Sequence, residues 1–162
     1  MKKRTFLLLP LLALLFVFAK CKDDDKMVAL PEAVKNYISD KYPGYDVDES
    51  EQETSCTGTT VYDVTLEKGK TEVELTFDAE GSFLYSESDI QPSDLPQAVK
   101  DGIAANYAGF STEEASRMDM ADGSKQYEVE LKNGAAQKEV LLTEGGTVIC
   151  EAEGDGDEDD DE

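Results

Sequence analysis

The chain repeats itself, and this repeat limits the possible folds more than any other feature. Residues 30–35 (LPEAVK) recur as residues 95–100 (LPQAVK), an offset of 65 positions (95 − 30). The match continues without a gap: Ile38 meets Ile103, Tyr42 meets Tyr107, Gly44 meets Gly109, Val64 meets Val129, and Gly81 meets Gly146. Because prolines, turn glycines and apolar positions all stay in phase, we interpret the chain as two copies of one structural unit.

Each copy opens with a predicted helix. Val34, Ile38 and Tyr42 follow one another at four-residue steps, which places them on one apolar helix face. The second copy repeats this stripe at the same spacing. Asp94 and Gln97 have the spacing of a capping box, in which two side chains satisfy the first backbone N–H groups of a helix.

One position breaks the match between the two helices. Gly102 stands where the first copy has Tyr37. Glycine inside a helix costs about 1 kcal/mol relative to alanine. Either a close contact requires Gly102, or the position has simply drifted.

Strand signals follow each helix as runs in which apolar and polar side chains alternate. These runs are residues 62–67, 72–77 and 82–85 in the first copy and residues 127–131, 140–142 and 148–150 in the second. Residues 45–53 and 110–118 alternate only weakly, and we interpret them as the first strand of each copy. Each copy is thus predicted to be a helix packed on a three- to four-stranded antiparallel meander.

The predicted fold class is therefore α+β. A unit of about sixty residues buries little surface and is marginally stable alone. We expect the two copies, residues 30–90 and residues 91–152, to place their sheets side by side with both helices on one face.

Structural motifs in both copies resemble one known family. In the first copy, the resemblance rests on residues 30–31 (LP), residues 42–44 (YPG) and residues 77–83 (FDAEGSF). The second copy departs from the pattern, with Ala108 in place of Pro43 and no Phe-Asp turn. These motifs are similar to those of the PepSY-like, β-lactamase-inhibitor-like family of exported bacterial proteins. The resemblance implies tandem helix-and-sheet units, a sheet face able to receive a partner, and no catalytic residues; a fold does not fix an activity.

Residues 1–20 form a predicted signal peptide. Basic residues 2–4 precede an apolar run, residues 6–19, which is shorter than the roughly 20 residues of a membrane-spanning helix. The alternative is a short membrane anchor.

Cys21 resembles the lipidated cysteine of bacterial lipoproteins, because a short apolar run precedes it and a polar stretch follows it. Lys20 departs from that pattern, which has a small residue at this position. Without lipidation, the chain would be released by another cleavage or held by its leader. Residues 22–25 (KDDD) resemble an export signal to the cell surface, or else form a solvated spacer. We expect residues 21–29, the lipidated cysteine and an acidic linker, to anchor the protein to the outer membrane, facing the periplasm or the cell surface.

The charge balance excludes several classes of function. Asp and Glu number 37 against 15 Lys and Arg, the net charge is −22, and histidine is absent. Nucleic-acid binding needs clustered basic residues, so it is not expected. Catalysis by Ser-His or Cys-His pairs and metal binding by histidine need imidazole. We therefore predict no enzyme activity, no cofactor and no metal site.

The predicted strands carry acidic and polar side chains on one face. These residues are Asp63, Thr65, Glu67, Glu72, Glu74, Glu128, Glu130 and Glu139. One interpretation is a solvated strand face that prevents association between sheets. The other is a docking surface for a basic protein or peptide, with charge setting the association rate and the selectivity.

Two cysteines remain after Cys21. Cys56 and Cys150 form an even pair in an oxidising compartment, which is compatible with a disulfide. The repeat aligns Cys56 with Ala121 and Cys150 with Tyr85, so the two copies hold no second pair of this kind. The alternative is a buried Cys150 and an exposed Cys56, both as thiols.

Residues 153–162 are predicted to be a disordered acidic tail, because they consist only of acids and glycine. The acids begin like a calcium-binding loop but lack its central glycine and its length. The sequence as a whole predicts a non-catalytic exported module that binds a protein or peptide. The alternative function is an acidic envelope protein that weakly binds Ca²⁺ or other cations.

Overall fold

The computed structural model describes residues 27–153. The predicted signal peptide, Cys21 and residues 154–162 of the predicted tail lie outside the described residues. Glu153, predicted as the first residue of the tail, instead ends a strand. Among the residues that the structure describes, no helix has the length and apolar character needed to cross a membrane.

The two copies have the same order of elements, one helix followed by four strands. The first copy contains α1 (Glu32–Lys41), β1 (Asp46–Thr54), β2 (Thr60–Lys68), β3 (Thr71–Asp78) and β4 (Phe83–Ile90). A short 3-10 turn, Pro92–Asp94, leads to the second copy, which contains α2 (Gln97–Asn106), β5 (Ser111–Met120), β6 (Lys125–Asn133), β7 (Ala136–Thr143) and β8 (Val148–Glu153). The α+β fold class is confirmed, and the two weakly alternating runs are strands β1 and β5.

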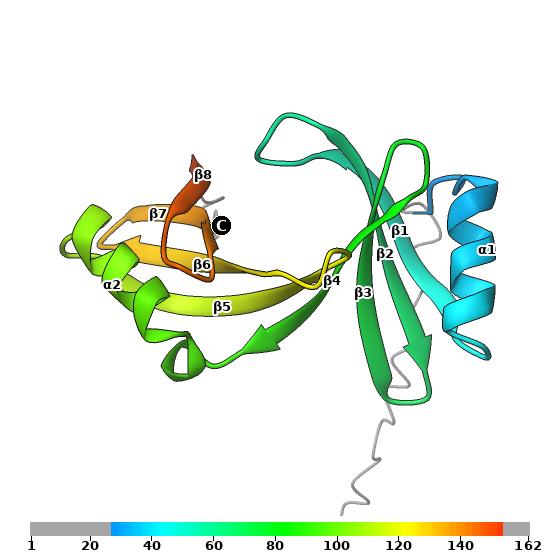
Figure 1. The fold of residues 1–162 in the computed structure, drawn as a ribbon, viewed down its shortest axis with the longest axis horizontal. Helices are drawn as coiled ribbons and strands as arrows, with labels where there is room; N and C mark the ends of the chain where they lie inside the picture. The colour runs from blue at the N-terminus through cyan, green and yellow to red at the C-terminus, as the bar shows by residue number, and fades with distance from the viewer. Residues whose placement is uncertain (1–26, 154–162) are drawn as a thin grey trace, which may run out of the picture.

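All eight strands belong to one antiparallel sheet, in the order in which they occur along the chain. The copies join where β4 pairs with β5, from Tyr85 opposite Met120 to Ile90 opposite Ala115. Figure 1 shows that the sheet turns sharply at this junction, so that the strands of the two copies run in different directions. Helix α1 covers the outer side of the first copy and α2 covers the outer side of the second.

Each helix buries its apolar stripe on its own half of the sheet. In the first copy, Val34 and Ile38 of α1 contact Val64, Leu66 and Phe77 in one buried cluster. The second copy forms the equivalent cluster on α2. Because side chains alternate along a strand, burying every second residue leaves the other sheet face for the polar residues between them.

The predicted capping box is wrong. Helix α2 begins at Gln97 with Pro96 as its N-cap, and no side chain caps it. Asp94 ends the preceding 3-10 turn, and extended backbone at Leu95 and Pro96 separates it from the helix. The Gln97 side chain instead donates a hydrogen bond to Asp101, 2.8 Å away.

Gly102 marks a contact between backbones. A Cβ atom at this position would lie 2.2 Å from the carbonyl oxygen of Gly146. Gly146, in the turn before β8, has a φ of +79°, and its own Cβ would lie 2.0 Å from the carbonyl oxygen of Ala98. The close-contact interpretation of Gly102 is therefore correct, because neither backbone can move aside as a side chain would.

We predict that Gly102→Ala destabilises the protein by about 1–3 kcal/mol, the usual cost of overpacking. Helix propensity alone would change stability in the opposite direction, by about 1 kcal/mol. Urea unfolding followed by circular dichroism measures the difference. Ala104→Gly, at an exposed position of the same helix, reports the propensity effect by itself. A Gly102→Ala protein more stable than the parent would contradict the contact.

Candidate functional site: a concave acidic sheet face

The eight residues predicted for the acidic face all lie on the side of the sheet opposite the helices. In β2 and β3 they alternate with the buried Val64, Leu66 and Leu75, and in β6 and β7 with the buried Val129 and Val140. We call this side of the sheet the acidic face.

The structure adds further acids that the sequence pattern did not reveal. They are Glu49, Glu51 and Glu53 of β1, Glu87 and Asp89 of β4, and Glu114 of β5. Acids occur at consecutive positions in β1 and β5, and a register shift lies between Val47 and Glu49 and another between Thr112 and Glu114. A shift of this kind changes which side chains share a face, so simple alternation could not assign the acids of β1 and β5. Those of β4 were missed because the predicted strand ended at residue 85, whereas β4 continues to Ile90.

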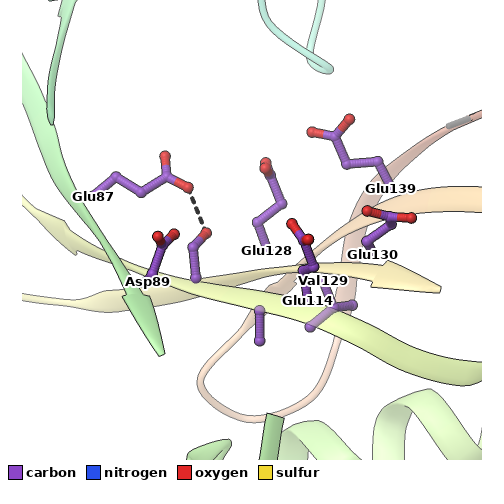
Figure 2. A pocket seen from close by; sticks show the side chains of 9 residues that line it. Glu87, Asp89, Glu114, Glu128, Val129, Glu130 and Glu139 are labelled. Atoms are coloured by element: carbon purple, nitrogen blue, oxygen red, sulfur yellow. Dashed lines mark hydrogen bonds between the residues drawn. The ribbon is translucent and has the colours of Figure 1, made fainter. Parts of the chain in front are cut away.

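The acids of both copies converge over the middle of the sheet. A hollow of about 320 Å³ is lined by Glu87, Asp89, Glu114, Glu128, Glu130 and Glu139, among others. Figure 2 shows Glu87 and Asp89 entering this space from β4 while Glu128, Glu130 and Glu139 enter it from β6 and β7. The hydroxyl of the buried Ser116 donates a hydrogen bond to Glu87.

A second hollow, of about 370 Å³, lies beside the first, beneath the loop between β1 and β2. Its apolar lining comprises Val61, Leu84, Tyr85, Met118, Met120, Leu141 and Ala152. Its acidic lining comprises Glu53, Glu128 and Glu139. We call this space the apolar hollow. The sequence analysis did not predict this hollow. Met118 and Leu141 could have indicated it, because they are apolar residues at strand positions where the alternation places polar side chains.

Burial and mutual repulsion raise the pKa of several glutamates on this face. Burial raises the pKa of Glu128 to about 9, with further contributions from a hydrogen bond and the charge of Glu139. Burial, with a hydrogen bond to Asp63, raises the pKa of Glu53 to about 7. The pKa of Glu87 is also raised by burial, partly offset by the hydrogen bond from Ser116. With a pKa of about 9, Glu128 therefore holds its proton near neutral pH.

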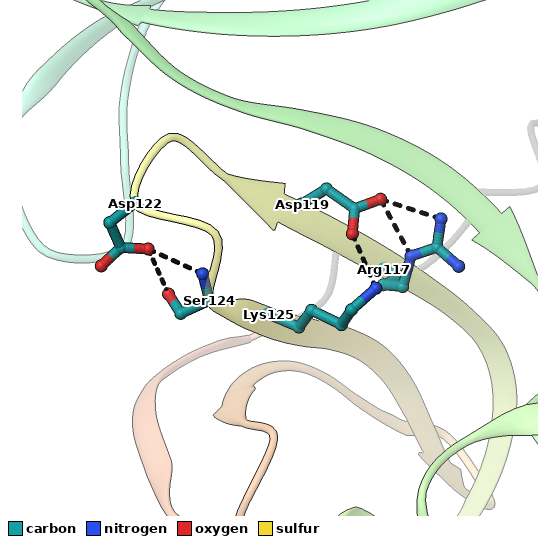
Figure 3. Close-up of polar contacts among 5 residues, drawn as sticks. All are labelled: Arg117, Asp119, Asp122, Ser124 and Lys125. Carbon is teal, nitrogen blue, oxygen red and sulfur yellow. Dashed lines mark hydrogen bonds and ion pairs between the residues drawn. The ribbon is translucent and has the colours of Figure 1, made fainter.

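Most basic side chains of the strands point away from this face. Arg117 and Lys125 bind Asp119 at 2.8 Å and 3.0 Å (Figure 3). The register of β5 and β6 places all three in phase with the buried Tyr127, on the side of the sheet that carries the helices. Lys138 contacts Glu151 at 3.2 Å on the same side. Among the described strand residues, Lys132 at the end of β6 is the basic side chain in register with the acidic face.

A disulfide joins the two ends of the sheet. Cys56, in the loop between β1 and β2, bonds to Cys150 of β8 across 94 residues, with the Cα atoms 6.0 Å apart. Figure 1 shows this loop leaning across the bend of the sheet toward β8. The aligned positions in the other half, Ala121 and Tyr85, also lie at a junction between copies, because the Ala121 N–H donates to the Leu84 carbonyl at 2.7 Å. Backbone hydrogen bonds link the two copies where β4 pairs with β5. At the other junction, between β8 and the loop that follows β1, the disulfide links them instead.

Within residues 27–153, no group of three or more Asp, Glu or Cys side chains is arranged to hold a metal ion. The tail, which the alternative function involves, lies outside the described residues.

The protein is a tandem-repeat α+β protein. Its two copies, each a helix followed by a four-stranded meander, share one sheet with a hollowed acidic face. The family model described as "Putative beta-lactamase-inhibitor-like, PepSY-like" matches residues 20–85 and again residues 60–150. The chain belongs to this family, as its motifs predicted. No curated protein matches the chain.

Solved structures share the fold. A BLIP-like protein from Bacteroides fragilis superposes with a TM-score of 0.52 at 20% identity, over 86% of this chain and 96% of that one. A protein from Bacteroides eggerthii, described as putative periplasmic, superposes with a TM-score of 0.55 at 12% identity, over 78% of this chain and 90% of that one. At these identities the likeness shows the fold alone.

We predict that replacing the disulfide by Cys56→Ser with Cys150→Ser lowers the free energy of unfolding by roughly 2–5 kcal/mol, because the unfolded chain regains the entropy of a long loop. Urea unfolding under oxidising conditions measures the loss. Reductant should destabilise the parent and leave the double variant unchanged. Equal stability of parent and variant would contradict the bond.

We predict that the free energy of unfolding falls as the pH rises from about 4.3, the ordinary pKa of a glutamate, toward the pKa of about 9 of Glu128. Over this window the folded protein keeps a proton that the unfolded chain releases, so higher pH favours unfolding. Glu128→Gln should reduce this dependence and raise stability at pH 8. Urea unfolding at pH 5, 6.5 and 8 tests it, with the exposed Glu67→Gln as control. An unchanged slope in Glu128→Gln would refute the assignment.

Proposed function

We propose that the protein is an exported, lipid-anchored binding module without catalytic activity, and that its acidic face binds a basic protein or peptide. The observation that supports this most is the convergence of acids from both copies over one hollowed surface, with the basic side chains of Arg117, Lys125 and Lys138 placed on the opposite side. Charge complementarity with a basic partner would relieve the repulsion among these carboxylates.

The acidic face differs from an ordinary solvated strand face in two respects. It is hollowed between β4, β6 and β7, so that a partner can be surrounded on several sides. Glutamates at its centre are half-buried and have raised pKa values, as at Glu128 and Glu87. A surface that served only for solubility would keep its charges separate and fully hydrated, since close carboxylates are unfavourable.

Export and anchoring rest on separate support. A disulfide persists in oxidising compartments outside the cytosol, and the Bacteroides eggerthii relative is described as a putative periplasmic protein. Lipid attachment at Cys21 would hold the module at a membrane surface without a spanning helix. The lack of histidine in the sequence supports a non-catalytic role, because Ser-His and Cys-His pairs cannot form.

We expect the chain without residues 1–21, which retains every described residue, to capture basic proteins from envelope extract at low salt. Glu72→Lys with Glu74→Lys should abolish that capture, because two charges on the acidic face are reversed. Glu32→Lys with Asp40→Lys reverses two exposed charges on α1 and should leave capture intact. Mass spectrometry identifies proteins that bind the parent and the α1 variant but not the face variant. The proposal fails if capture is the same for all three proteins.

A further inference from the structure

The apolar hollow is suited to a ligand with two different ends. Its floor is formed by Val61, Met118 and Leu141, and its acidic wall by Glu128 and Glu139. At about 370 Å³ it is near the lower limit of ligand pockets, which run from roughly 300 to 1,000 Å³. It therefore fits a single side chain or a fragment of similar size.

We propose that the apolar hollow receives one lysine or arginine side chain of the bound polypeptide, with its methylene stem against Val61, Met118 and Leu141 and its cationic head beside Glu128 and Glu139. This inference rests on the proposed function and names the anchor by which the partner is held. Lysine and arginine commonly bury their aliphatic stems along apolar surface while the charged head stays with polar groups. Methionine at the floor allows either side chain to be accommodated, because its thioether adapts its shape.

The loop above the apolar hollow is held in place before any ligand arrives. Cys56 in this loop is bonded to Cys150 of β8. Within the loop, the hydroxyl of Ser55 lies 2.9 Å from that of Thr57 and 2.8 Å from that of Thr59. A preformed wall lowers the cost of ordering on binding, so the anchor site does not depend on a loop closing over the ligand.

The charges around Glu128 favour a cation over any other ligand. Titratable groups that share a hollow with it are Glu53 from β1, Asp63 from β2, Glu74 from β3, Tyr85 and Glu87 from β4, and Glu139 from β7. Its neighbour on β5 is the uncharged Ser116. No basic residue is among the described residues that line the apolar hollow. A cationic head arriving here takes the place of the proton on Glu128, which leaves to solvent as the carboxyl becomes a carboxylate.

The test uses three blocked tripeptides that differ at one residue between two alanines. The first carries lysine, the second carries norleucine, which keeps the stem without the charge, and the third carries diaminopropionate, which keeps the charge without the stem. Each is titrated into the chain without residues 1–21, labelled at the methionine methyl groups. Nuclear magnetic resonance then reports on Met118 and Met120 within the hollow, with the exposed Met27 as an internal control.

We expect the lysine peptide to shift the signals of Met118 and Met120 saturably, with the Met27 signal unchanged, and the other two peptides to bind at least tenfold more weakly. Affinity for the lysine peptide should rise by up to tenfold per pH unit between pH 6 and pH 8, because one proton leaves for each peptide bound. Glu128→Gln, which conserves shape, should weaken binding and remove most of the pH dependence.

Equal binding of the lysine and norleucine peptides, or unchanged binding by Glu128→Gln, would overturn the inference. If the lysine peptide does not shift the Met118 and Met120 signals, but protein capture still depends on Glu72 and Glu74, the lysine or arginine anchor site is refuted. The proposed function then still holds. If the lysine peptide binds as expected but protein capture is the same with and without Glu72→Lys and Glu74→Lys, the proposed function is overturned instead.

Discussion

The pairing of β4 with β5 is the interaction on which the rest of the structure depends. It joins two helix-and-meander units, each too small to be comfortably stable alone, into one eight-stranded sheet. The pairing runs from Tyr85 opposite Met120 to Ile90 opposite Ala115. Because the sheet turns at this junction, Glu87 of the first copy comes to line the same hollow as Glu128 of the second. Without the junction there would be two separate acidic strand faces and no concave surface.

The disulfide closes the other junction between the copies. The duplicated chain has two places where one copy meets the next, β4 with β5 and β8 with β1, but the sheet remains open at the second. Cys56 and Cys150 join the copies there covalently, at positions that correspond in the repeat to Ala121 and Tyr85. The same bond holds the β1–β2 loop above the apolar hollow. A feature that stabilises the fold therefore also shapes the surface on which binding is proposed.

The acidic face costs the fold free energy, because burial and like charges keep glutamates such as Glu128 and Glu87 from ionising normally. A chain with a large excess of acids could have spread them over loops and helices. Instead many of them gather on one face while Arg117 and Lys125 are paired on the other. A basic ligand would recover this cost on binding, which is the physical link between the electrostatics of the free protein and its proposed role.

The sequence by itself determined the duplicated helix-and-meander unit, because turn glycines, helix stripes and period-two strands are local patterns that repeat in phase. It also determined which side of β2, β3, β6 and β7 is acidic, since one buried residue in two assigns the other face. Sequence pattern did not place Glu87, because the predicted strand ended at Tyr85 whereas β4 continues to Ile90. It did not place Glu53, because a register shift and consecutive acids hide which side chains of β1 share a face. Capping chemistry at Asp94 was misjudged because it depends on backbone angles that spacing does not reveal. Only the tertiary structure decided that the two acidic faces meet over one hollow and that Cys56 reaches Cys150. Both depend on the twist of a sheet that brings together residues far apart in the chain, and that twist accumulates over strand pairings that no local pattern records.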